Sequence, residues 1–243
     1  MPSTRHRRSI TASTLPSLAD RLIAETSRHG LDRRLILPPA ALAVLLLGLG
    51  EHHAAGLELI AEHSRPAHTV RQALEAAGEE FDYLNGSLDP LTRLLDFEKP
   101  DLVDRAVSAL LSVLAAAGLP SLAEHPLVAG DLLGPLYSAV MAPADIAARG
   151  AFYTPPALAQ LIAAMTGLPR PGQSVSDPCS GTAGLTIAML RAMRVDGRAP
   201  ELVHWQLQDL DGLALALAGI QMAAHGIPHV TLTHGNTLAQ AAS

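Results

Sequence analysis

The 243-residue chain has little cysteine and no excess of positive charge, and each shortage excludes a class of protein. Its one cysteine, Cys179, rules out a disulfide within the chain and fits a reducing compartment. The formal net charge is −6. Residues 1–150 hold 13 basic and 18 acidic side chains, and residues 151–243 hold 4 and 5. Neither segment has the basic excess that is typical of a free-standing nucleic-acid-binding domain.

Aromatic residues and long apolar runs are also scarce. Aromatics make up 3% of a chain that is 49% hydrophobic, so the core must be built from aliphatic side chains, and the abundance of Ala and Leu favours helices. The most apolar run, residues 40–50, is too short to span a bilayer. The basic cluster at Arg5, Arg7 and Arg8 is followed by polar residues instead of the apolar segment of a signal peptide. We therefore expect a cytoplasmic protein without a membrane segment.

Helical periodicity dominates the first 140 residues. Apolar residues recur at helical spacing between Pro, Gly and capping residues, which predicts an N-terminal helical domain over residues 1–140. The expected helices span residues 15–30, 38–64, 68–84, 100–120 and 131–141.

From about residue 150 short strands alternate with helices. This β-α-β-α-β order predicts a parallel sheet of about three strands covered by helices. The fold class is therefore α/β, with a partial Rossmann-like domain over residues 141–243. The expected strands are 173–177, 201–209 and 229–235, and the expected helices are 155–168, 182–195 and 212–226.

The segment SVSDPCSGTAGLTIAML, residues 174–190, joins the first of these strands to a helix. In open α/β sheets this is where ligands bind, and Gly181 lets a ligand approach the backbone. The segment has only two of the three glycines of a dinucleotide fingerprint, and it lacks the Gly-Lys of a P-loop and the first glycine of a nucleophile elbow. An ordinary strand-to-helix turn remains the alternative to a ligand-binding loop.

Cysteine and histidine suggest no other chemistry. No histidine is committed to Cys179, and a small packed thiol is the preferred interpretation. His225 and His229 are four residues apart, but Gly226 and Pro228 lie between them. The two imidazoles therefore do not share a helix face, and no metal site is predicted.

Polar residues follow the next two strands. Asp209, at the end of the second strand, is placed to accept hydrogen bonds from two ribose hydroxyls, whereas Asp211 is predicted to cap the following helix. Asn236 follows the third strand and offers an amide that can pair with an adenine edge. For each residue the alternative is an ordinary polar loop position.

Taken in order, four segments give a more specific signal than any one alone. The series GAFYTPPALAQLI, SDPCSGTAGLTIAM, QLQDLDGLALALAGIQMAAHGI and HGNTL resembles the S-adenosylmethionine-binding half of N6-adenine DNA methyltransferases, above all the modification subunits of type I restriction systems. DLLGPLYSAVM is similar to the helix that precedes the F-Y-T-P motif in that family. The resemblance covers about residues 130–238, and it departs from the family where Ala183 replaces a usual glycine and Gln221 replaces an asparagine.

The resemblance implies S-adenosyl-L-methionine as cofactor and DNA methylation in a restriction-modification system as function. It implies that the F-Y-T-P segment lines the methionine end of the cofactor, that the D-P-x-x-G loop lies beneath it, and that the residues after the second and third strands bind the ribose and the adenine. The implied cofactor-binding residues are Phe152, Tyr153, Thr154, Pro155, Asp177, Pro178, Ser180, Gly181, Gly184, Asp209, Leu210 and Asn236.

One part of the family pattern has no match in the sequence. The family orients a flipped adenine with a [DNS]-P-P-[YFW] motif, which residues 1–243 lack, so no catalytic residue is predicted. A sheet ending at its third strand is also expected to leave one strand edge unpaired and one flank apolar. We therefore expect an incomplete enzyme that works in a complex with DNA and a second protein chain, which supplies the catalytic motif and target recognition. The alternative is a catalytically inactive methyltransferase-like module.

Overall fold

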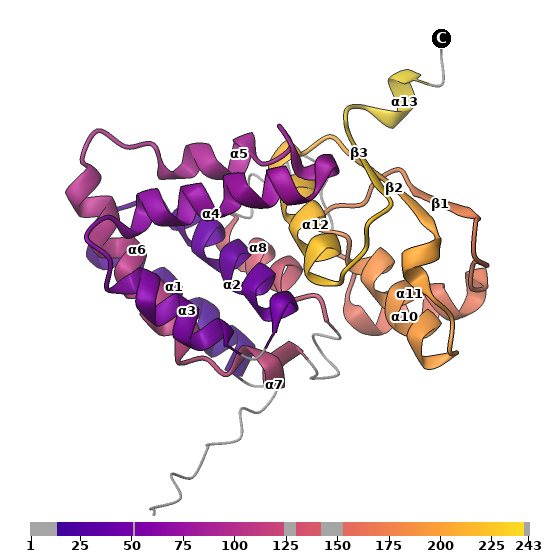
Figure 1. Ribbon diagram of the computed structural model, residues 1–243, viewed down its shortest axis with the longest axis horizontal. Coiled ribbons are helices and arrows are strands. Elements are labelled where there is room, and N and C mark those ends of the chain that lie inside the picture. Colours follow the sequence, from indigo (N-terminus) through magenta and orange to yellow (C-terminus); the bar gives the residue numbers. More distant parts are fainter. Residues whose placement is uncertain (1–13, 51, 124–129, 142–152, 241–243) are drawn as a thin grey trace, which may run out of the picture.

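The computed structural model describes residues 14–50, 52–123, 130–141 and 153–240 (Figure 1). Helices fill the first part of the chain, and a small parallel sheet with its own helices forms the second part beside them. The two predicted classes of structure, helical and then α/β, are both confirmed. No helix among the described residues is long and apolar enough to cross a membrane.

The helical part contains eight α-helices within the described ranges. Their ends follow the punctuation of the sequence: Pro66 opens one helix, Pro100 opens another, and Gly50, at φ 136°, ends a third. The α-helices are α1 (Thr14–Arg28), α2 (Leu37–Leu49), α3 (His53–Ala61), α4 (Pro66–Glu80), α5 (Asp89–Thr92), α6 (Pro100–Ala115), α7 (Leu119–Ala123) and α8 (Leu133–Val140); the short 3-10 turns are η1 (Arg33–Ile36), η2 (Asp82–Leu84) and η3 (Arg93–Leu95).

The second part is built around three parallel strands in the order β1-β2-β3. Ser174 pairs with His204 where β1 and β2 begin, and Asp209 pairs with His234 where β2 and β3 end. All three predicted strands are confirmed, but β2 begins three residues later than expected because a 3-10 turn occupies its predicted start. The elements are α10 (Pro156–Thr166), β1 (Ser174–Asp177), α11 (Gly184–Val195), η4 (Pro200–Leu202), β2 (His204–Asp209), α12 (Gly212–Ala224), β3 (Val230–His234) and α13 (Thr237–Gln240).

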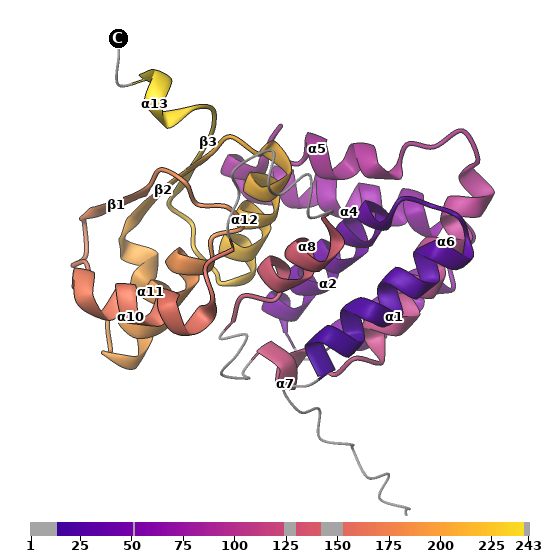
Figure 2. The ribbon, with the colours of Figure 1, turned by 180° about the vertical axis from the view of Figure 1, so that it is seen from behind.

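Helices cover one face of this sheet. Trp205 and Leu207 of β2 are buried in a core that also contains residues of α10, α11 and α12. Helix α12 has a second apolar surface, because Leu217 and Ile220 belong to the core of the helical part. The helix therefore lies between the sheet and the N-terminal helices, as both views show (Figures 1 and 2). The division of the chain at residue 140 remains a prediction, and the two parts on either side of it share α12.

The opposite face of the sheet is exposed and polar. Its side chains alternate with the buried ones along the strands, as the two-residue period of a strand requires. The exposed members are Ser174, Ser176, His204, Gln206 and Thr231. This face is therefore not the apolar flank that the sequence predicts. Exposed apolar side chains lie instead on α10, at Leu158, Leu161 and Met165.

The outer edge of β1 is unpaired within the part of the chain that the structure describes. Strand β1 has β2 on one side and is the first strand in the sheet order. The expected open edge is thus present, next to α10 and α11 in the ribbon (Figure 1).

Candidate functional site

The carboxyl ends of the strands bring the predicted acidic residues together. The Asp209 carboxylate accepts the backbone N–H of Gly181 at 2.7 Å through Oδ2, and the N–H of Asp211 at 2.8 Å through Oδ1. Asp209 is therefore bonded to the loop that follows β1, across 28 residues of sequence. Because each carboxylate oxygen can accept two hydrogen bonds, Asp209 keeps acceptor capacity for a ligand.

The loop from Asp177 to Gly184 is held by backbone contacts and turns twice through positive φ. The Ser180 N–H donates to the Gln208 carbonyl at 2.9 Å, and the Ala183 N–H donates to the Ser180 carbonyl at 2.8 Å. Gly181 has φ 52° and nothing within 4 Å of the place a Cβ would occupy. The loop therefore presents open backbone at Gly181, as a close approach by a ligand requires.

Ser180 has a hydroxyl that no described residue satisfies. The residue is 7% exposed, and its Oγ lies buried without a hydrogen-bond partner in the described structure. A buried polar atom without a partner is costly unless something binds it. The Ser180 hydroxyl is thus a candidate ligand contact.

Asp177, at the end of β1, lies beside a second negative charge. Burial raises its pKa and the charge of Asp209 raises it further, while hydrogen bonds from the Cys179 N–H and the Thr186 hydroxyl lower it. Burial and the charge of Asp209 outweigh the hydrogen bonds, and the net pKa of Asp177 is raised. The loop therefore keeps a carboxyl group that takes up a proton more readily than a solvated aspartate does.

Two residues after β2 have separate roles. Leu210 is 63% exposed and presents an apolar surface beside Asp209. Asp211 accepts the N–H groups of Leu213 and Ala214 at the start of α12, which confirms the predicted helix cap. The Tyr137 hydroxyl of α8 also donates to Asp211, at 2.5 Å.

Asn236, after β3, is exposed and caps the short helix α13. Its Oδ1 accepts the Leu238 N–H at 3.0 Å, which is the alternative polar-loop role expected for this residue. The neighbouring Thr237 hydroxyl donates to the Pro178 carbonyl at 2.7 Å. These contacts place the residues after β3 against the loop after β1, and they leave the Asn236 NH2 group as a donor for a ligand.

The F-Y-T-P segment meets the loop through a buried carboxylate. The Tyr153 hydroxyl donates to Oδ2 of Asp131 at 3.3 Å, and burial together with this negative charge raises the pKa of the phenol. Thr154 lines a cavity of about 10 Å³ with Tyr153 and Gly184, which is room for about one water molecule. Pro155 is exposed, and Phe152 lies outside the described residues.

Sequence reasoning missed two residues of this region, Asp131 and Gln221. They are 3% and 1% exposed and are bonded to each other at 3.0 Å, although 90 residues separate them. Asp131 is the first residue of the segment DLLGPLYSAVM, so a signal was present. Its partner on α12 depends on tertiary packing, which local spacing does not give.

Cys179 differs from its prediction. The thiol is exposed at the loop surface instead of being packed in the core, because the Asp177–Cys179 turn directs the chain outward before Ser180 returns to the interior.

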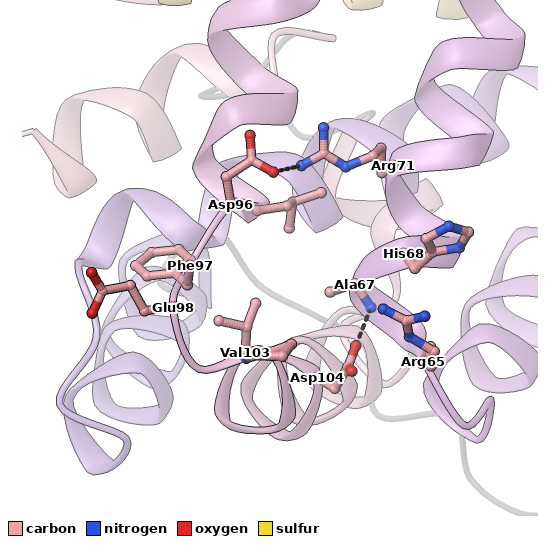
Figure 3. A pocket seen from close by; sticks show the side chains of 11 residues that line it. Arg65, Ala67, His68, Arg71, Asp96, Phe97, Glu98, Val103 and Asp104 are labelled. Atoms are coloured by element: carbon pink, nitrogen blue, oxygen red, sulfur yellow. Dashed lines mark hydrogen bonds and ion pairs between the residues drawn. The ribbon is translucent and has the colours of Figure 1, made fainter.

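A larger hollow, of about 570 Å³, lies in the helical part between α4 and the segment that leads into α6 (Figure 3). Several of its polar groups already pair with one another. Arg71 forms an ion pair with Asp96, and Asp104 accepts the Ala67 N–H at 3.0 Å. The hollow shares no residue with the strand-end region, so we do not include it in the candidate site.

Comparisons with known proteins give one family model and a similar solved structure. Residues 128–243 match a family model described as N-6 DNA Methylase. Among solved structures, the chain is similar to a type I restriction-modification system methyltransferase subunit from Streptococcus thermophilus, with a TM-score of 0.49 and 18% identity. The similarity covers 93% of this chain and 60% of that subunit, so the chain spans about three fifths of its length. No curated protein matches.

Proposed function

We propose that this protein, residues 128–243 of which match a family model described as N-6 DNA Methylase, is the S-adenosylmethionine-binding part of a DNA adenine-N6 methyltransferase of the restriction-modification type. The observation that carries the proposal is the Asp209 carboxylate, bonded to the Gly181 N–H beneath open backbone at the strand ends. When bound, S-adenosylmethionine supplies an activated methyl group for transfer.

The residues at the strand ends fit this cofactor. The backbone N–H groups of Gly181 and Asp211 hold the Asp209 carboxylate in place, and its remaining lone pairs can accept hydrogen bonds from two ribose hydroxyls. The exposed side chain of Leu210 offers an apolar surface to the adenine ring. The Asn236 NH2 group can donate to the adenine edge.

In this proposal the loop and the F-Y-T-P segment bind the methionine end of the cofactor. The unpartnered Ser180 hydroxyl, the open backbone at Gly181 and the Asp177 carboxyl are available from the loop. Tyr153, Thr154 and Pro155 are assigned to the other side, with Pro178 and Gly184 shaping the turn, and the family resemblance adds Phe152. We assign no catalytic residue to the chain, because residues 1–243 contain no [DNS]-P-P-[YFW] motif.

We also propose that the methyltransferase acts in a complex with DNA and a second protein chain, in the cytoplasm. The unpaired edge of β1 offers a row of backbone groups to a further parallel strand. Beside it, Leu158, Leu161 and Met165 form an exposed apolar face of α10 at the i, i+3, i+7 spacing of a helix contact. The partner would complete the sheet here and supply the catalytic motif and target recognition.

Calorimetric titration with S-adenosylmethionine tests the cofactor assignment. The protein is expected to bind in the micromolar range, and Asp209→Ala should weaken binding at least ~10-fold, because hydrogen bonds to a charged group contribute ~1.5–3 kcal/mol. Glu201→Ala is the matched control, since it removes an exposed acid at the other end of β2 and should leave affinity unchanged. Binding of NAD in preference to S-adenosylmethionine would overturn the proposal. An absence of binding to either would favour the inactive interaction module.

A further inference from the structure

Gln221 is the one polar side chain in α12 and is nearly inaccessible to solvent. Its Nε2 donates to the Thr182 carbonyl at 2.5 Å and to Oδ1 of Asp131 at 3.0 Å, and its Oε1 accepts the Leu133 N–H at 3.4 Å. Because the Thr182 carbonyl and the carboxylate can only accept hydrogen bonds, the amide has one workable orientation. Gln221 thus joins three segments that are far apart in the sequence.

Asp131 holds the other end of this contact. Its Oδ1 accepts the Gly134 N–H at 2.7 Å as well as Gln221, and its Oδ2 accepts the Tyr153 hydroxyl. A Cβ added to Gly134 or Gly184 would lie 2.3 or 2.8 Å from Oδ2. The carboxylate therefore packs directly against the backbone of α8 and of α11, and it has no room to move.

The loop needs such support at Ala183. This residue has φ 73° and ψ 23° and is the only non-glycine residue with positive φ in the described part of the chain. The left-handed region is disfavoured for alanine because of its Cβ. The peptide unit between Thr182 and Ala183 sets the φ of Ala183, and the carbonyl oxygen of that unit is the one that Gln221 binds.

We propose that Gln221 and Asp131 are positioning residues for the cofactor loop, and that their hydrogen-bonded pair keeps Ala183 in its left-handed conformation. The inference rests on the proposed cofactor role of the loop. With Ala183 held, its N–H reaches the Ser180 carbonyl and α11 begins at Gly184. The Ser180 hydroxyl and the Gly181 backbone then stay at the strand ends, where the cofactor is expected.

A double-mutant cycle between Gln221→Met and Ala183→Gly tests the inference. Methionine keeps the size of the side chain but loses both donors, whereas glycine adopts positive φ without support. The first readout is hydrogen exchange of the Ser180, Gly181 and Ala183 amides without ligand. Exchange should be ~10-fold faster in Gln221→Met, as expected for loss of the hydrogen bond to the Thr182 carbonyl. In the double variant it should stay within ~3-fold of the rate in the original protein. The affinity for S-adenosylmethionine should follow the same order.

Two further variants separate positioning from general stability. Leu217→Ala removes a buried side chain one turn away on α12, and it should lower global stability without selective exchange in the loop. Asp131→Asn keeps an oxygen for Gln221 and Gly134, and it should preserve loop protection.

The binding and exchange experiments test the proposed function and the positioning role separately. If the unchanged protein fails to bind S-adenosylmethionine, the proposed function fails, and the exchange cycle still tests the positioning role. Equal loop exchange in Gln221→Met with and without Ala183→Gly would overturn the positioning role, as would the same selective loop exchange in Leu217→Ala.

Discussion

Asp131 shows how burial and hydrogen bonding compete on a single carboxyl group. Burial raises its pKa to about 6, even though the Gly134 N–H, the Gln221 amide and the Tyr153 hydroxyl all donate to the ionised form and lower it. The desolvation cost of the charge therefore exceeds what three donors return. The carboxyl group takes up its proton within reach of a simple pH titration.

The pKa of Asp131 predicts the sign of a pH effect on stability. Between about pH 4 and 6 the folded protein binds a proton here that the unfolded chain has lost, so this residue makes the free energy of unfolding fall as pH rises. The difference from its ordinary pKa of 3.8 amounts to ~3 kcal/mol. Asp131→Asn should lose this dependence.

Urea unfolding of the original protein and of Asp131→Asn, from pH 4.5 to 7.5, checks this expectation. The free energy of unfolding of the original protein, minus that of the variant, should decrease as the pH rises from 4.5 to 7.5. Parallel curves would show that the carboxyl group titrates at its ordinary pKa.

At this scale the sequence was most informative where a role depends on neighbours in the chain. Asp211 could be predicted as a helix cap because its partners, Leu213 and Ala214, follow within three residues. The contact of Asp209 with Gly181 and that of Asp131 with Gln221 could not be predicted, because each joins residues of different elements.

Among the elements, α12 depends on a close approach by α2. A Cβ added to Gly48 would lie 2.3 Å from the carbonyl oxygen of Ala224, which is backbone and cannot move aside cheaply. Glycine is therefore required at this position for packing, although it lies in a helix, where it is otherwise unfavourable.

Gly48→Ala should destabilise the protein by ~1–3 kcal/mol, the range for overpacking. Gly56→Ala in α3 is the matched control. Its Cβ would meet only Leu46 Cδ1, at an ordinary 3.6 Å, so the substitution should be neutral or stabilising by ~0.5–1 kcal/mol. Thermal unfolding of both variants measures the difference. A neutral Gly48→Ala would mean that the two helices separate without cost.

Element types followed from periodicity, but some boundaries did not. The apolar pattern over residues 38–64 predicts one helix, whereas the structure has α2 and α3 with Gly50 between them. Two segments that are each helical look continuous in a periodic pattern, and only a backbone break such as φ 136° at Gly50 reveals the join.

For the whole molecule, the position of α12 predicts a single cooperative transition. Apolar residues of this helix belong to the core of the helical part and to the core beneath the sheet, so we expect the two cores to unfold together. Trp205, the only tryptophan of the chain, is fully buried in β2 and reports on the sheet. Ellipticity at 222 nm reports mainly on the helices.

Tryptophan fluorescence and ellipticity should therefore give the same urea midpoint and the same slope. Two separate midpoints would contradict the shared core and would support two independent domains divided near residue 140.

The order of helical and α/β parts was visible in the sequence, because it depends on local periodicity. The polar outer face of the sheet was partly visible in the polar β1 segment. The packing of α12 against both parts could not be predicted. A helix that is apolar on nearly every side is recognised as buried, but its sequence does not say what buries it.

The bond from Gln221 to Thr182 has a thermodynamic corollary for the N-terminal helices. Coupling free energies are reciprocal. If packing between α2, α8 and α12 maintains the loop, then a ligand that binds the loop must stabilise those helices by the same amount. Occupancy of the strand ends would then be measurable at a distance, as slower hydrogen exchange in α2 and α8.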